Sequence, residues 1–152
     1  MPNRSRPQVK PIPDGYHAVQ PYLILGNAAA AIEFYKQAFG AKERFRMEHE
    51  GRISHAEIEI GDSCIMMADE HPAIGAYSPK HYGGSPVSLM IYVTDCDAVY
   101  KQALAAGAAS NREPADQFYG DRMAGIDDPF GYKWYLATHV KDVSVEEMKQ
   151  HS

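Results

Sequence analysis

Cysteine, basic charge and long apolar runs are all scarce in this 152-residue sequence, and each shortage excludes a class of protein. The net charge of -5 argues against a nucleic-acid-binding surface, because phosphate contacts need clustered Lys and Arg. No apolar run approaches the roughly 20 residues that a membrane-spanning helix requires. The N-terminal stretch also has no apolar core of a secretory signal peptide. We therefore expect neither a nucleic-acid nor a membrane partner.

The two cysteines, Cys64 and Cys96, are too few for a disulfide framework. With no secretory signal, we predict a cytoplasmic protein with free thiols. Short catalytic motifs are missing as well: there is no Gly-rich phosphate loop, serine nucleophile elbow or CxxC pair. The stretch DDPFG at 127–131 is typical of a turn and not of a calcium loop.

Basic residues cluster only near the N-terminus, where prolines interrupt them. Arg4, Arg6 and Lys10 share the first 15 residues with four prolines. This composition predicts a flexible leader over residues 1–15, followed by one folded domain over 16–140.

The most informative feature that is present is an internal repeat. Residues 22–40 and 89–107 both read as a strand, a turn, a helix and a glycine, and YKQA occurs near the end of both helices. Several strand-like segments, separated by turns that contain glycine, follow each copy. A repeated unit of this kind predicts two packed modules with a ligand cavity where they meet.

Each module is predicted to have the order βαβββ, which makes the fold α+β. The modules cover 17–69 and 85–139, and their helices cover about 27–39 and 95–106. Favourable N-cap residues and terminal glycines mark both helices. A long Pro- and Gly-containing loop at 70–86 joins the modules. A capping-box pattern predicts a short helix within the C-terminal segment 141–152.

The strand near 53–60 carries polar residues on one face. His55, Glu57 and Glu59 alternate with apolar residues that would pack on the helices. This face either is simply solvated or lines the cavity, where His55 and Glu57 would be the acid–base pair. A metal site that combines them with His71, His81 or Asp69 is an alternative without a chelating spacing.

A second cluster, QFYGDR at 117–122, combines aromatic rings with a fixed cation. Phe118, Tyr119 and Arg122 suit a flat or anionic ligand. In the alternative interpretation, Arg122 and Asp121 form a structural pair while Phe118 fills the core.

Strand alternation predicts a soft lining for the cavity. The inward residues would be Tyr22, Met66, Met90, Tyr92 and Tyr135, while Trp134 would face the helices. The same lining is also consistent with a filled core. His139 is more typical of a strand end than of a catalyst.

The duplicated unit, with the phrases AIEFYKQAFGA and DDPFGYKWYLATH, resembles the vicinal oxygen chelate superfamily, which includes glyoxalase I, bleomycin-resistance proteins and extradiol dioxygenases. The resemblance covers about residues 17–139 and implies a cup-shaped mixed sheet. The stretches ISHAEIEIGDSCIMMADE and DQFYGDR look like a branch of small bacterial glyoxalase-like proteins. Members of that branch are similar to demethylubiquinone-methyltransferase-like proteins, and some are encoded near phosphonate-use genes.

Metal-dependent members of that superfamily hold a divalent metal with His or Gln, Glu, His and Glu. The resemblance places these positions at Gln20, Met66, Ser88 and Tyr135 of this chain. A thioether and neutral hydroxyls are poor ligands for Zn, Ni or Fe, so we expect no bound metal and no other cofactor.

These observations predict a homodimeric protein that binds a small organic molecule in the cup without metal. The predicted ligand contacts are Gln20, Tyr22, Met66, Tyr92, Phe118, Tyr119, Arg122 and Tyr135. Three alternatives stay open: a metal-dependent lyase, isomerase or dioxygenase with shifted ligands, a metal-free enzyme that uses His55 and Glu57, and an interaction module with filled cups.

Overall fold

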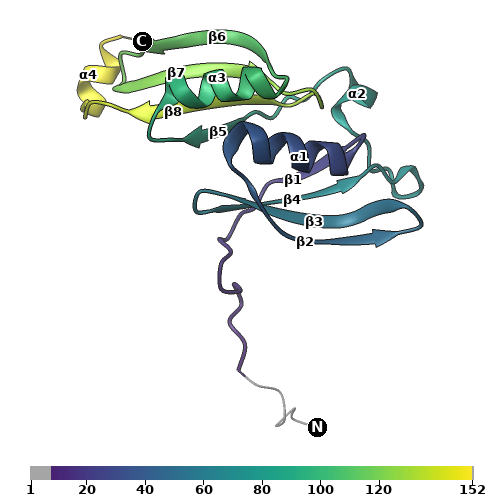
Figure 1. Ribbon diagram of the computed structural model, residues 1–152. Helices are drawn as coiled ribbons and strands as arrows, with labels where there is room; N and C mark the ends of the chain where they lie inside the picture. The colour runs from purple at the N-terminus through teal and green to yellow at the C-terminus, as the bar shows by residue number, and fades with distance from the viewer. Residues whose placement is uncertain (1–7, 152) are drawn as a thin grey trace.

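The computed structural model describes residues 8–151, which form two four-stranded mixed sheets (Figure 1). The first module contains β1 (Tyr22–Leu25), α1 (Ala28–Phe39), β2 (Lys42–His49), β3 (Arg52–Ile60) and β4 (Ser63–Asp69). The second contains β5 (Leu89–Tyr92), α3 (Cys96–Ala106), β6 (Ala109–Asp116), β7 (Asp121–Asp127) and β8 (Lys133–His139). The strand orders are β1-β4-β3-β2 and β5-β8-β7-β6, so the second sheet repeats the first. The predicted α+β fold of two βαβββ modules is confirmed.

The segment between the modules contains two short helices, η1 (Pro72–Ile74) and α2 (Pro79–Tyr82). The predicted loop at 70–86 is therefore partly helical. A proline begins each helix and a glycine with positive φ ends it. Prolines suit the first turn of a helix, and glycine tolerates the left-handed conformation at its end.

The first strand is shorter than the predicted span from His17. Pro21 has no N–H to donate, and the backbone N–H of His17 donates to Gln20 Oε1 at 2.5 Å. This local contact folds the chain before it reaches the sheet, so pairing with β4 begins only at Tyr22.

Helix α1 follows directly from its sequence. The Asn27 side chain caps it by accepting from the Ala30 N–H, and Gly40 ends it at a φ of 70°. Ala28, Ile32 and Tyr35 are buried along one stripe of the helix. That stripe faces the sheets, so the helix is fixed against the core.

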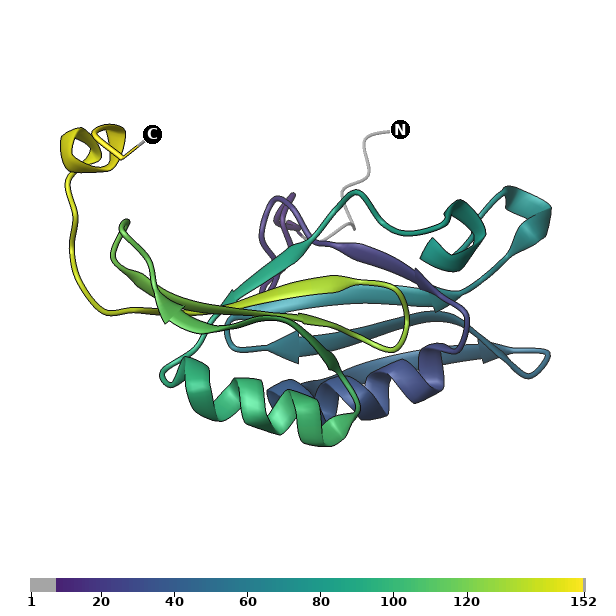
Figure 2. The ribbon, with the colours of Figure 1, turned by 90° about the horizontal axis from the view of Figure 1, so that it is seen from above.

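Both long helices cover the same side of the molecule, and the opposite faces of the sheets stay uncovered (Figure 2). The helices touch through Gln102 of α3, whose Nε2 donates to the backbone oxygens of Gln37 and Ala38. Residues on the helix side of the strands, such as Ala56, Ile58 and Leu136, are fully buried. The uncovered faces therefore carry the residues available for a site.

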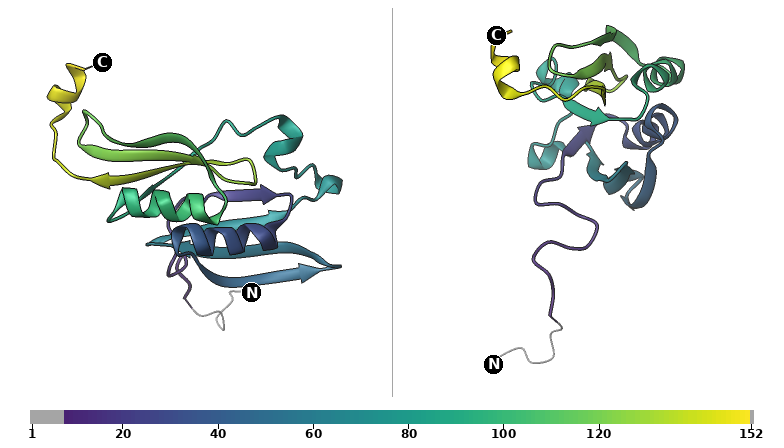
Figure 3. Two further views of the ribbon diagram at one scale, coloured as in Figure 1. Left: turned by 45° about the horizontal axis from the view of Figure 1, so that its top comes forward. Right: turned by 90° about the vertical axis from the view of Figure 1, so that its left-hand side faces the viewer.

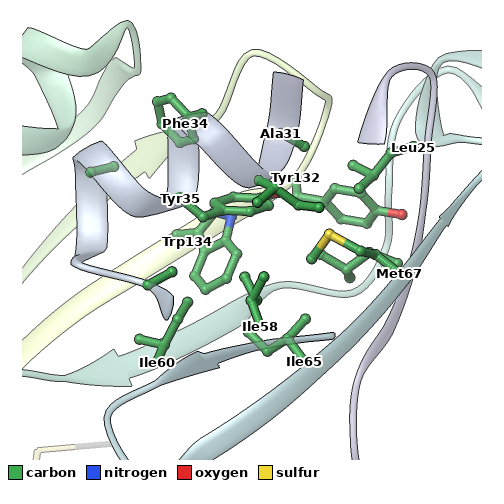
Figure 4. Packing of buried hydrophobic residues seen from close by; sticks show 14 of the residues in the cluster. Leu25, Ala31, Phe34, Tyr35, Ile58, Ile60, Ile65, Met67, Tyr132 and Trp134 are labelled. Carbon is green, nitrogen blue, oxygen red and sulfur yellow. The ribbon is translucent and has the colours of Figure 1, made fainter. Parts of the chain in front are cut away.

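One apolar core joins the two modules (Figure 4). The Trp134 ring of β8 lies 5.2 Å from the Tyr35 ring and 4.7 Å from the Phe39 ring, both on α1. The buried Asp128 carboxylate accepts from Tyr35 Oη at 2.7 Å and from Trp134 Nε1 at 2.9 Å. Because this carboxylate links residues of both modules, their relative position is fixed by packing and hydrogen bonds.

The C-terminal helix α4 (Val145–Lys149) lies beyond the end of the second sheet (Figure 3). The His151 ring stacks on Phe118 at 4.9 Å, and the backbone N–H groups of Val140 and Lys141 donate to the Gly120 oxygen. The loop before β7 thus holds the C-terminal segment. Over residues 8–151, no helix has the length and apolar character needed to cross a membrane.

Candidate functional site

An open cleft of about 1610 Å³ lies between the first strands of the two modules. His17, Val19 and residues 21–23 line one side of it, and Ser85 and residues 87–94 line the other. Strand β1 pairs with β4 and β5 pairs with β8, so each first strand is the edge of its sheet. Tyr22 and Tyr92 are both in the lining. The cleft is the cavity that the internal repeat predicted at the junction of the modules.

In the first module, Tyr22 begins a chain of hydrogen bonds that runs into the sheet. Its Oη lies 2.8 Å from His55 Nδ1, and His55 Nε2 lies 2.8 Å from Glu57 Oε2. The register places Tyr22 and Glu57 on either side of Met66, on the uncovered face of the sheet. The predicted acid–base pair is therefore in contact, and the cleft residue next to it is a tyrosine.

Glu57 is a buried carboxylate with several partners. It accepts from Tyr16 Oη at 2.5 Å and lies 3.7 Å from the Cys64 thiol, which donates to the same oxygen. Burial raises the pKa of Glu57, but the hydrogen bonds from His55 and Tyr16 outweigh burial and lower the pKa overall. An ionised Glu57 only accepts hydrogen bonds, so His55 Nε2 donates to it, and Nδ1 of the neutral ring is then an acceptor for the Tyr22 hydroxyl.

Sequence reasoning missed Tyr16. The Arg44 guanidinium lies 4.4 Å from the centre of its ring and donates to the neighbouring Gly15 oxygen. Residues 11–13, Tyr16 and Gln20 also border a smaller pocket of about 490 Å³ that reaches Glu57 and Met66. Nothing in the local sequence distinguishes Tyr16, because its partners come from distant strands.

The second module has a comparable cluster behind Tyr92. Its Oη donates to the buried carboxylate of Asp121 at 2.8 Å, and His139 Nδ1 lies 2.8 Å from the other oxygen of the same carboxylate. His139 Nε2 lies 2.7 Å from Asp142. Hydrogen bonds to Asp142 and Asp121 raise the pKa of His139, and the bond to Asp121 raises the pKa of Tyr92.

The order of the groups differs between the two clusters. Tyr22 contacts an imidazole, whereas Tyr92 contacts a carboxylate. A phenol beside a carboxylate must donate to it, so Tyr92 offers the cleft only its lone pairs. A phenol beside an imidazole can give its proton either to the ring or to another acceptor. The two tyrosines therefore have different hydrogen-bonding capacities.

The structure brings some of the other predicted residues to the uncovered faces. Gln20 and Met66 border the smaller pocket near Glu57. Tyr135 lies opposite Met90 and Gly125 in the second sheet, and Tyr119 donates to Met123 Sδ at 3.5 Å. Phe118 is instead exposed and stacks on His151.

Arg122 lies apart from the cleft. Its Nε donates to Asp97, in the first turn of α3, at 2.7 Å, and its Nη1 donates to Asp116 at 3.2 Å. It therefore faces the helix side of β7, whereas its neighbour Asp121 faces the opposite side. The alternative pairing of Arg122 with Asp121 is also not what the structure shows. Arg122 is therefore not part of the cleft lining.

The residues at the superfamily's metal positions do not fit a divalent metal. Gln20, Met66, Ser88 and Tyr135 supply no imidazole, carboxylate or thiolate donor. The Gln20 carbonyl oxygen already accepts from His17. Within residues 8–151, no group of three or more His, Cys, Asp or Glu is arranged to hold a metal ion. No chemistry through a metal is derived for this site.

Comparisons with known proteins agree with this fold. A family model described as the glyoxalase/bleomycin resistance protein/dioxygenase superfamily matches residues 16–136. An uncharacterized protein of Mycobacterium tuberculosis is 37% identical over 136 residues, which is 87% of this chain and 80% of that protein.

Two solved structures have similar folds. An Arabidopsis thaliana gene product has a TM-score of 0.63 at 24% identity and covers 80% of this chain and 98% of its own. TioX from a Micromonospora species has a TM-score of 0.64 at 21% identity and covers 84% of this chain and 100% of its own. At these identities the structures show the fold alone, but the family model spans most of the chain. The chain belongs to the glyoxalase/bleomycin resistance protein/dioxygenase superfamily.

Proposed function

We propose that this protein binds a small organic molecule in the cleft between its two modules, without a divalent metal. One observation carries the proposal: the cleft is lined from both modules by tyrosines that are hydrogen-bonded to clusters containing a buried carboxylate and a histidine. Ligand sites typically combine an apolar wall with a few convergent polar groups. Leu23, Val87 and Met90 supply apolar wall in the same cleft.

The proposed ligand is planar and carries a carbonyl or carboxylate group. Aromatic and thioether side chains favour flat apolar surfaces, and Met90 and Tyr92 are both exposed. The buried clusters hold the tyrosine hydroxyls in place, which lowers the entropic cost of binding.

A thermal-shift screen of planar carboxylates and carbonyl compounds tests this proposal. A binding compound should raise the melting temperature equally before and after treatment with a chelator. Tyr22→Phe should reduce that shift, because it removes the hydroxyl that can donate to the carbonyl or carboxylate of the ligand. Tyr100→Phe is the matched control, because Tyr100 bonds Ser110 outside the cleft. If no compound stabilises the protein, or if stabilisation requires added metal, the proposal is wrong.

We also propose that the protein is a homodimer. The edge strand β2 of the first sheet leaves Phe45 and Met47 exposed. Apolar side chains grouped on open sheet faces favour contact with a second copy. Light scattering should therefore give about twice the chain mass of 16.9 kDa at micromolar concentration. A particle of the chain mass would contradict the proposal.

A second candidate function is metal-free acid–base catalysis. The continuous chain from Tyr22 through His55 to Glu57 favours it, because such a chain can move a proton between the cleft and the sheet. In this case Tyr22 contacts the substrate, while Glu57 is enclosed by Tyr16 and Cys64. Deuterium exchange from solvent into the α-carbon of a bound carbonyl compound would test this function.

A further inference from the structure

We propose that the cleft selects oxyanions, such as carboxylates, enolates or phenolates, and that His55 takes up one proton as each oxyanion binds to Tyr22. This inference rests on the proposed function, because it requires a ligand in the cleft. It adds the charge of the ligand and the residue that balances it.

In the resting state, each hydrogen bond of the chain is donated toward Glu57. Glu57 accepts from His55 Nε2–H, so Nδ1 of the neutral ring accepts the Tyr22 hydroxyl proton. In this state the Tyr22 oxygen presents only lone pairs to the cleft. Tyr22 can donate to an approaching oxyanion only by giving up its hydrogen bond to His55 Nδ1, so binding to the neutral pair loses one hydrogen bond.

A proton on His55 Nδ1 reverses this situation. The imidazolium then donates through Nε2 to Glu57 and through Nδ1 to the Tyr22 oxygen, which frees the Tyr22 hydroxyl to donate to the oxyanion. Binding takes up one ligand anion and one solvent proton; the only covalent bond formed is Nδ1–H of His55, and the Tyr22 O–H bond is kept. The bound state carries a charge-assisted chain from the ligand to Glu57, and such hydrogen bonds are stronger than neutral ones.

The groups around this chain leave His55 as its proton acceptor. Hydrogen bonding to Glu57 and burial raise the pKa of Tyr16, and burial raises the pKa values of Tyr22 and Cys64. Arg44 approaches Glu57 to 4.0 Å and also contacts Glu59, and the pKa of Arg44 is raised. The pKa of Glu57 is lowered. Between about pH 6 and 8, these tyrosine, cysteine, arginine and glutamate groups keep one protonation state, so the Nδ1 lone pair of the imidazole is the proton acceptor that the chain offers.

The second cluster does not duplicate this device. Tyr92 donates to a carboxylate and has no imidazole behind its oxygen. His139 reaches Tyr92 only through Asp121, and it is already held between Asp121 and Asp142. His139 and His17 also line the cleft, so the experiment needs a histidine control.

Isothermal titration calorimetry with benzoate and with benzamide, its neutral analogue of similar shape, tests the proposal. Titrations in buffers of different ionisation enthalpy count the protons taken up with each ligand. Benzoate should bind more tightly than benzamide and take up close to one proton at pH 8. Its affinity should fall as the pH rises, because binding takes up a proton.

Tyr22→Phe and His55→Gln should abolish the proton uptake and weaken benzoate binding by about tenfold or more. Tyr92→Phe and His139→Gln, the matched controls in the second module, should leave the proton uptake intact. Nitrogen-15 NMR of the free protein should show the neutral His55 ring with its proton on Nε2.

Each contrary result has a separate meaning. Benzamide binding as tightly as benzoate, proton uptake that survives His55→Gln, or a proton on Nδ1 would overturn this inference and leave ligand binding in the cleft standing. Failure of both probes to bind at millimolar concentration would also overturn it. If the wider thermal-shift screen then finds no ligand either, the proposed function fails too.

Discussion

At the scale of single residues, the buried carboxylates Glu57 and Asp121 organise the candidate site. Each holds a tyrosine of the cleft or the histidine beside it, and each is almost fully buried. A buried charge is costly unless hydrogen bonds compensate it, so these residues keep their neighbours in defined positions. The local alternation on β3 predicted His55 and Glu57. Asp121 and His139 become partners only because β7 and β8 pair them directly.

Glu57→Gln should destabilise the protein by about 1–3 kcal/mol, because the amide cannot accept all the hydrogen bonds that the carboxylate accepts. The pKa of Glu57 is lowered in the folded state. Its contribution to stability is therefore present above the ordinary pKa of a glutamate and is lost as the pH falls through the folded value.

Urea denaturation at a series of pH values checks both parts of this prediction. The difference in stability between the wild type and Glu57→Gln should be largest near neutral pH and should shrink as the pH falls below about 4.5. Glu59→Gln is the control, since Glu59 is on the same face but more exposed. A difference that stays constant with pH would contradict the ionised Glu57.

At the scale of elements, the helices and most strands follow from the sequence. The predicted helices at about 27–39 and 95–106 correspond to α1 and α3, and each ends at its predicted glycine. Asn27 caps α1 and Asp95 caps α3, the latter one residue beyond the Thr94 that the capping-box pattern indicated. Strand β6 extends through Pro114 to Asp116. β6 is an edge strand, and proline is tolerated there because one side of the strand needs no ladder hydrogen bonds.

Arg122 shows where prediction from the local sequence pattern fails. Its aromatic and acidic neighbours made it a candidate for ligand binding, but β7 begins at Asp121 and alternates from there. Ala124 and Ile126 are buried on the helix side, so Arg122, two residues before Ala124, faces that side as well. A firm strand boundary would have placed it correctly.

Substitution of Gly120 tests, at the scale of elements, how the C-terminal segment is held against the loop before β7. Its φ is 98°, and an added Cβ would lie 2.0 Å from the Lys141 backbone oxygen. Gly120→Ala should therefore cost more than the usual penalty for a left-handed residue, about 2–4 kcal/mol, and should release residues 140–151.

Gly61→Ala is the matched control, because Gly61 also has a positive φ but has no atom within 4 Å of an added Cβ. It should cost only about 1–2 kcal/mol. Chemical denaturation measures both costs, and hydrogen exchange of the Val140 and Lys141 amides reports release of the segment. Equal costs for the two variants would show that the segment does not depend on close contact with Gly120.

At the scale of the whole molecule, the repeat predicted two modules and a cavity between them, and the sequence could not show how they are joined. The joining residues lie far apart in the chain, as in the contact of Tyr35 with Asp128. The sequence predicted Asp128 only as part of a turn. In the structure its carboxylate is buried and accepts hydrogen bonds from Tyr35 of the first module and Trp134 of the second. Cross-module contacts of this kind have no local signal.

Tyr35→Phe should destabilise the protein by about 1–3 kcal/mol, because it removes a hydrogen bond to a buried carboxylate. Tyr100→Phe, which removes a more exposed hydrogen bond to Ser110, should cost roughly 0.5 kcal/mol or less.

The fluorescence of Trp134, the single tryptophan, reports on the junction between the modules. Its unfolding transition should coincide with that from far-UV circular dichroism, since one core spans both modules. An earlier fluorescence transition would mean that the modules separate before they unfold.

The central claim is that the ligand site is the cleft between the modules. Amide NMR of the chelator-treated, isotope-labelled protein, titrated with the compound that stabilises it most in the thermal-shift screen, tests this claim most directly. The account predicts that the largest shifts occur in residues 17–23 and 85–94 together, with further changes at His55 and Asp121. Shifts confined to one module, or to the helix side around Asp97 and Arg122, would contradict it.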